Sequence, residues 1–150
     1  MPRLNLDEVQ DAFLSALETA IPQKVVEQAI PDIDTVERYP DGSVKVYVAL
    51  QFGDLMEGQT HSAAGPIGDD YIVPVYVQAV APSAEIARKV ANRVVSAVLG
   101  ESFQWSGSVR KRLGGGLWPI VGSNGATEAY LAPASFSVPM QLAWVEDDDD

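Results

Sequence analysis

The sequence predicts an α+β domain in which a mainly antiparallel sheet of about four strands packs against two helices, with long loops between them. Three observations lead to this fold class. Two segments repeat apolar residues at helical spacing, several others have the alternation or β-branched composition of strands, and two stretches are rich in glycine. The 150 residues, 47% of them apolar, suit one domain, expected over residues 1–145. Residues 146–150, Glu-Asp-Asp-Asp-Asp, predict an acidic disordered tail.

The first predicted element is a helix over residues 6–20. Asn5 and Glu8 have the spacing of a capping box, and Pro22 ends the helical pattern. The segment 23–30 that follows fits either a short strand or one more helical turn. The apolar stripe of the helix consists of Leu6, Val9, Phe13, Ala16, Leu17 and Ala20.

The next element is a predicted hairpin, formed by residues 33–38 and 44–51 around a turn at 39–42. The turn contains Asp41-Gly42, and glycine supplies the positive φ that tight hairpin turns need. Period-two alternation predicts one buried and one partly wet face of the second strand. The buried face is expected to hold Val44, Val46, Val48 and Leu50, and the wetter face Lys45, Tyr47, Ala49 and Gln51.

Residues 53–70 predict a long loop, because they contain four glycines and a proline and show no sustained period. Residues 71–80 are β-branched and aromatic, as in a central strand. Pro74 lies within that strand and predicts a bulge or an exposed edge there.

A second helix is expected to start at Pro82-Ser83 and to end at Gly100. The glycine runs at 114–116 and 122–125 predict a second irregular region, and residues 135–145 predict a last strand. The sequence assigns no role to the segment 101–133 that contains these runs. The apolar stripe of the helix consists of Ile86 or Ala87, Val90, Val94 and Val98.

Charge is unevenly distributed along the chain, whose net charge is -11 at pH 7. Residues 83–112 carry six basic and two acidic groups, and no basic residue follows Arg112. The acidic excess disfavours sequence-independent binding to phosphate backbones. The chain has no cysteine, which excludes disulfides and thiolate metal sites, and no run long enough for a membrane span, so we expect a cytosolic protein without membrane contact.

No catalytic constellation can be recognised, so we expect no enzymatic activity, cofactor or metal. His61 is the only histidine, and the glycines at 114–116 fit neither a P-loop nor a dinucleotide fingerprint. Ser108 and Lys111 match Ser-x-x-Lys without the companion motifs of that enzyme class. The remaining alternative is a small ligand-binding domain or hydrolase that uses His61.

The order of elements resembles the tail terminator (tail-completion) proteins of long-tailed bacteriophages. The resemblance rests on Tyr71–Val80 running into Ser83–Arg88 and covers residues 4–99 and 134–145. It implies a virion subunit that forms a homo-oligomeric ring, usually a hexamer, at the head-proximal end of the tail. Such a ring terminates tail polymerisation and joins the tail to the head.

The partners implied by the resemblance are the major tail tube protein and a head-tail connector or neck protein, with DNA only passing through the channel. The protein would lie in the host cytoplasm during assembly and at the head-tail junction of the finished virion. Another head-tail connector or neck subunit is an alternative with the same physical requirements.

A ring built by head-to-tail contacts needs two complementary faces on each subunit. We expect these faces to be oppositely charged, and we expect the first long loop to reach the tail tube. The predicted interface residues are Arg88, Lys89, Arg93, Arg110, Lys111 and Arg112 on the basic side and Asp7, Asp11 and Glu18 on the acidic side. The predicted tube contacts are Asp54, Leu55, Met56, Glu57 and His61.

Overall fold

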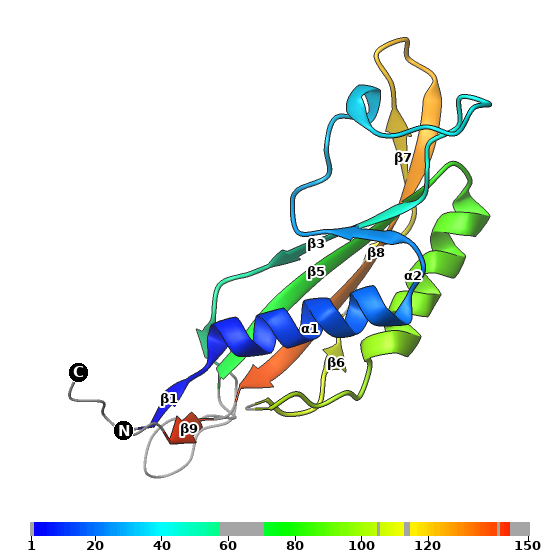
Figure 1. Cartoon of the computed structure of the whole chain (residues 1–150). Helices are drawn as coiled ribbons and strands as arrows, with labels where there is room; N and C mark the ends of the chain where they lie inside the picture. Colours follow the sequence, from blue (N-terminus) through cyan, green and yellow to red (C-terminus); the bar gives the residue numbers. More distant parts are fainter. Residues whose placement is uncertain (1, 58–70, 105, 113–114, 141, 145–150) are drawn as a thin grey trace, which may run out of the picture.

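The computed structural model describes residues 2–57, 71–104, 106–112, 115–140 and 142–144 (Figure 1). The predicted tail at 146–150 and most of the predicted loop at 53–70 lie outside these ranges. The elements in chain order are β1 (Pro2–Leu4), α1 (Leu6–Ala20), β2 (Lys24–Val26), the 3-10 helix η1 (Ile33–Thr35), β3 (Tyr47–Phe52), β4 (Met56–Glu57), β5 (Tyr71–Ala81), α2 (Ala84–Val98), β6 (Arg110–Lys111), β7 (Trp118–Val121), β8 (Thr127–Met140) and β9 (Leu142–Trp144).

The α+β class is confirmed, but the predicted sheet of about four antiparallel strands is too small. The main sheet has seven strands in the order β2-β3-β5-β8-β6, with β4 also paired to β5 and β7 also paired to β8. It is mixed, because β2 runs parallel to β3 while the other pairs are antiparallel. The ambiguous segment 23–30 therefore supplies an edge strand.

Both predicted helices are present and pack on one face of the sheet (Figure 1). Ser83 caps α2, since its hydroxyl accepts a hydrogen bond from the Ile86 N–H at 3.2 Å. Leu99 is the C-cap residue, and Gly100 follows it with φ +81°. The predicted capping box of α1 is wrong: Asn5 is the N-cap residue, but its side chain makes no capping hydrogen bond.

The main core lies between the helices and the sheet. Phe13 of α1 is fully buried at its centre, with the rings of Phe52, Phe103 and Phe136 at centroid distances of 6.0–6.2 Å. Such edge-on and tilted pairs are the arrangements that aromatic rings prefer. The first helix is thus fixed to three separate parts of the chain.

A second, smaller core lies on the opposite face of the sheet, where residues 26–44 cross it. Its buried residues are Ile33, Val44, Tyr47, Ala49, Val80 and Ala129. The predicted wet face of residues 44–51 is therefore wrong at Tyr47 and Ala49, because a segment without helical or strand periodicity covers them.

The predicted turn at 39–42 is confirmed, with Gly42 at φ +89°. Its first arm is mostly not a strand, since η1 occupies residues 33–35 and only Arg38 pairs with Val44. The side chain of Arg38 holds this segment against the sheet through an ion pair of 3.0 Å with Glu128 of β8.

The central strand β5 confirms the strand predicted for residues 71–80. The bulge or exposed edge predicted at Pro74 is wrong, because β5 pairs with β8 through Pro74 without a register shift and Pro74 is buried. On one edge, Tyr71 and Ile72 of β5 pair with β4, and residues 75–80 pair with β3. Pro74 therefore lies in the interval between the two partner strands. Gly53 crosses this gap, and its N–H donates to the Pro74 carbonyl at 2.8 Å. Because the N–H and C=O of a strand residue point to the same side, the proline leaves this residue pair with one hydrogen bond instead of two.

The irregular region predicted from the glycine runs at 114–116 and 122–125 is wrong in part, because β7 lies between the two runs and β8 begins just after the second. β8 spans fourteen residues and pairs with β5 along eleven of them. On its outer edge, Pro133 lies between the residues that pair with β7 and those that pair with β6. The predicted last strand is thus the end of β8 followed by β9, which pairs with β1 in a separate two-stranded sheet.

Candidate functional site

Four of the five predicted tube-contact residues are described, and they are not all in a loop. Asp54 and Leu55 connect β3 to β4, whereas Met56 and Glu57 form β4 and pair with Ile72 and Tyr71 of β5. All four side chains are exposed, including the apolar Leu55 and Met56 at 36% and 42%. His61 lies outside the described residues.

The three predicted acidic interface residues lie on the outer face of α1. Asp7, Asp11 and Glu18 are exposed, and within the described ranges none of them forms an ion pair. Their charges are therefore available to a partner.

The three predicted basic residues of α2 do not form one patch. Lys89 forms an ion pair of 2.8 Å with Glu85, and this hydrogen bond lowers the pKa of the exposed Glu85 carboxyl. Arg93 lines a shallow hollow beside Ala20 at the end of α1, whereas Arg88 lines a different hollow on the side of β8. The structure brings Arg88, but not Arg93, near the second basic cluster.

That second cluster lies at the sheet edge formed by β6. Lys111 lines the same hollow as Arg88, and its ammonium donates to the Arg112 carbonyl at 3.1 Å. Arg110 is exposed, and the half-buried Arg112 has a buried guanidinium nitrogen, Nη1, without a hydrogen-bond partner in the described structure. This edge therefore presents cations that are not neutralised by ion pairs with described residues.

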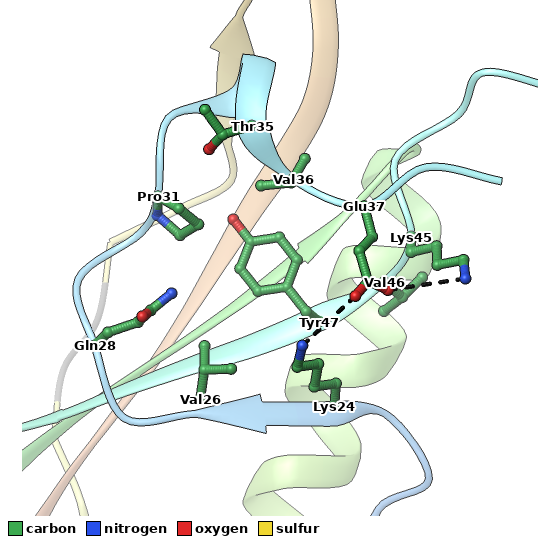
Figure 2. Close-up of a pocket in the computed structure, with 10 residues that line it drawn as sticks. All are labelled: Lys24, Val26, Gln28, Pro31, Thr35, Val36, Glu37, Lys45, Val46 and Tyr47. Carbon is green, nitrogen blue, oxygen red and sulfur yellow. Dashed lines mark ion pairs between the residues drawn. The ribbon is translucent and has the colours of Figure 1, made fainter.

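A pocket that the sequence did not predict lies near the opposite edge of the sheet, beneath the segment that leads from β2 to β3 (Figure 2). Its volume is about 310 Å³. At its mouth, Glu37 lies 3.7 Å from Lys24 Nζ and 3.8 Å from Lys45 Nζ. The other lining residues are Val26, Gln28, Pro31, Thr35, Val36, Val46 and Tyr47.

The most unusual group in this pocket is the hydroxyl of Tyr47. The side chain is 7% exposed, and its hydroxyl has no hydrogen-bond partner in the described structure. It points from β3 toward Pro31 and Thr35 (Figure 2). Burial raises the pKa of this phenol above its ordinary value. A buried polar group without a partner is costly, so such a group calls for an explanation.

Sequence reasoning missed this pocket because the alternation of residues 44–51 assigned Tyr47 to the wet face. A usable signal was the apolar content of the preceding segment. Val26, Ile30 and Val36 are half-buried against the second core, and a segment with that many apolar residues needs a surface to cover.

Large apolar side chains are exposed at the edge formed by β7. Trp118 is 62% exposed, Val121 53% and the preceding Leu117 43%. Isolated exposed apolar residues are common, but two on one short edge strand, Trp118 and Val121, are typical of a contact surface, whereas Leu117 lines the hollow beside α2.

No protein-family model matches the sequence, and no curated protein is significantly similar to it. Among the described residues, no cluster of histidine and acidic side chains has the arrangement of a metal site. Neither α1 nor α2 has the length and apolar content needed to cross a membrane.

Proposed function

We propose that this chain is a structural virion subunit that forms a ring at the head-proximal end of a phage tail tube. The ring would terminate tail polymerisation and join the tail to the head connector. The observation that carries the proposal is that acidic residues gather toward the β2 edge of the sheet and basic residues toward the β6 edge.

The acidic side consists of α1 and the elements next to it at the β2 edge. Residues 6–45 contain nine acidic and three basic residues, which gives a charge of -6. α1 contacts β2 and lies next to α2, which contacts β5 and β8. The basic side therefore consists of α2 and β6, within residues 83–112, whose six basic and two acidic residues give +4.

This arrangement supports a head-to-tail ring, because such a ring brings two different faces of neighbouring copies together. Opposite charges on those faces favour correct encounter and discourage the contact of like faces. The passage from β5 through Pro82 and Ser83 into α2, on which the family resemblance rests, is also present.

The test is to add the purified chain to growing tubes of the major tail tube protein of the same phage. We expect the tubes to stop growing and to carry a ring at one end in electron micrographs. The variant that tests the basic face is the Arg110→Glu, Lys111→Glu double variant. It reverses the charge of two exposed side chains and should reduce the capping of tubes relative to the wild type. Tubes that continue to grow at the normal rate, without bound chain, would contradict the proposal.

Another neck subunit remains the second candidate, since it needs the same two faces. A pull-down with separate tube and connector preparations distinguishes the two. Binding to the connector alone would favour the neck subunit.

A further inference from the structure

The Tyr47 pocket and the exposed Trp118 lie at the same level of the sheet and at opposite edges. The register connects them in one cross-strand row, in which Tyr47 pairs with Val80, Val80 with Leu131, and Leu131 with Trp118. Directly opposite residues of paired strands project to the same face. Both features therefore belong to the face that the helices do not cover.

The pocket requires a particular kind of occupant. Its volume of about 310 Å³ is at the small end of the range for ligand pockets, roughly 300–1,000 Å³, so it suits a single ring system. Valine and proline form much of the wall, and both lysines at the mouth already face Glu37. The occupant should therefore be an uncharged, flat, apolar group.

The polar groups inside the pocket define the occupant further. Thr35 already donates its hydroxyl proton to the Asp32 carbonyl at 2.7 Å, so its oxygen can only accept from an occupant. The Tyr47 hydroxyl has no partner and can also accept. An apolar ring with one N–H donor fits this set, and the indole of tryptophan is such a group.

We propose that the Tyr47 pocket of one copy receives the Trp118 side chain of a neighbouring copy, with the indole N–H donating to the Tyr47 hydroxyl. The contact joins the β7 edge of one subunit to the β2 edge of the next, so it is head-to-tail and repeats from copy to copy. This contact specifies how the subunits of the proposed ring join. That the joined copies close into a ring rests on the proposed function. The contact also gives the otherwise unpartnered hydroxyl a hydrogen bond.

The first test measures self-association of the chain alone by sedimentation. Because a buried tryptophan anchor is often a binding hot spot, we expect Trp118→Ala to raise the dissociation constant by about 30-fold or more. Tyr47→Phe, which removes only the hydroxyl, should raise it by about threefold to tenfold.

The matched control for the first test is Leu117→Ala. Leu117 is a neighbouring exposed residue that lines the hollow beside α2 rather than the Tyr47 row, and its replacement should change the dissociation constant by less than about twofold. Equal losses in Trp118→Ala and Leu117→Ala would overturn the proposed contact.

The second test uses the absence of cysteine from the chain. Gln28 lines the pocket and the exposed Val121 lies on β7 with Trp118, so a Gln28→Cys, Val121→Cys double variant retains both contact partners. A short bismaleimide should convert it into a ladder of cross-linked oligomers, and the largest oligomer should contain as many copies as the ring has subunits. The control pair Glu8→Cys, Val121→Cys should give no ladder, and equal ladders from the two pairs would overturn the proposal.

The outcomes separate this contact from the proposed function. If the chain caps tubes while Trp118→Ala associates as well as the wild type, the contact is wrong and the tail function stands. If association depends on Trp118 but tubes are unaffected, the contact stands and the tail function is wrong. A chain that remains monomeric at every concentration overturns the contact.

Discussion

Tyr47 illustrates how one residue can be placed well for packing and poorly for hydrogen bonding. Its ring fills the second core, while its hydroxyl is buried without a partner. Within the isolated subunit, burial of this hydroxyl costs desolvation free energy that no hydrogen bond to a described residue offsets. Removing it should therefore not harm the folded subunit.

We expect Tyr47→Phe to leave the free energy of unfolding at neutral pH unchanged or to raise it by up to about 1 kcal/mol. Alkaline pH should enlarge the difference. Burial holds the pKa of Tyr47 above its usual 10.0, so the folded state keeps the phenol proton when the unfolded chain has lost it. Stability present below about pH 10 is then lost as the pH rises through the folded-state pKa.

Urea denaturation of both proteins between about pH 7 and 11 measures this effect, because the comparison with Tyr47→Phe cancels the other titrating groups. The wild type should lose stability more steeply above about pH 10. Parallel pH profiles would mean that the hydroxyl is solvated in the folded chain.

Gly53 is a second position where the addition of one atom should change the stability of the fold. A Cβ added there would lie 2.6 Å from Pro74 Cγ, which is too close for a folded chain to accept without movement. We expect Gly53→Ala to lower the free energy of unfolding by about 1–3 kcal/mol, as other overpacking substitutions do. Thermal or urea unfolding measures this change.

The control for Gly53 is Gly116→Ala. A Cβ at Gly116 meets nothing within 4 Å, so this variant should be neutral or slightly stabilising. Similar losses at both glycines would show that chain stiffness, and not the contact with Pro74, sets the effect.

At the scale of elements, the two helices differ in how they begin. The Ser83 side chain accepts a hydrogen bond from the first turn of α2, whereas the Asn5 side chain makes no such bond in α1. The first helix is instead fixed by Phe13 among three other aromatic rings. Packing therefore compensates for the missing cap.

We expect Ser83→Ala to lower the free energy of unfolding by about 0.5–2 kcal/mol, the usual cost of a lost N-cap. Asn5→Ala should change it by less than about 0.5 kcal/mol, since no capping bond is lost. Urea denaturation of the two variants is the measurement. An equal loss at Asn5 would indicate that its side chain caps α1 in solution.

Elements with a strong local signal could be predicted from the sequence. The stripe at Ala87, Val90, Val94 and Val98 gives α2 correctly, and the β-branched run gives β5. The start of β8 was missed because the glycine runs at 114–116 and 122–125 predicted an irregular region before it. Pro133 lies between the residues of β8 that pair with β7 and those that pair with β6, where no described residue pairs with it on the outer edge, and this is a property of the assembled sheet.

Pairing between distant segments could not be predicted in the same way. Nothing local to Lys24–Val26 indicates that it lies parallel to β3. For the candidate site, the charged residues were found from composition, but the pocket was not. Tyr47 looks like a surface residue until the segment over 26–36 is placed on it.

At the scale of the whole molecule, the acidic α1 and the basic α2 lie next to each other on one face of the sheet, with α1 at β2 and α2 at β5 and β8. Few of these charges are used internally, since Lys89 is the only one of the six basic residues between 83 and 112 that forms an ion pair with a described residue. Most of the electrostatic field of these basic side chains therefore acts on neighbouring molecules.

Association between copies should therefore depend on salt. Raising the ionic strength from about 0.05 M to 0.5 M shortens the screening length several-fold, and we expect the dissociation constant of self-association to rise about tenfold. Sedimentation at a series of salt concentrations measures the slope. The Asp7→Asn, Asp11→Asn double variant should have a shallower slope, and a slope identical to that of the wild type would exclude α1 from the interface.

The pairing of β1 with β9 makes Pro2 and Trp144 cross-strand partners, at the end of the molecule opposite the tip of the β7–β8 hairpin (Figure 1). A fluorescent protein or affinity tag fused at either terminus would therefore emerge at one pole, away from that tip. The same proximity invites circular permutation, with a short linker joining the old ends and new ends opened at the exposed turn of Ser123 and Asn124.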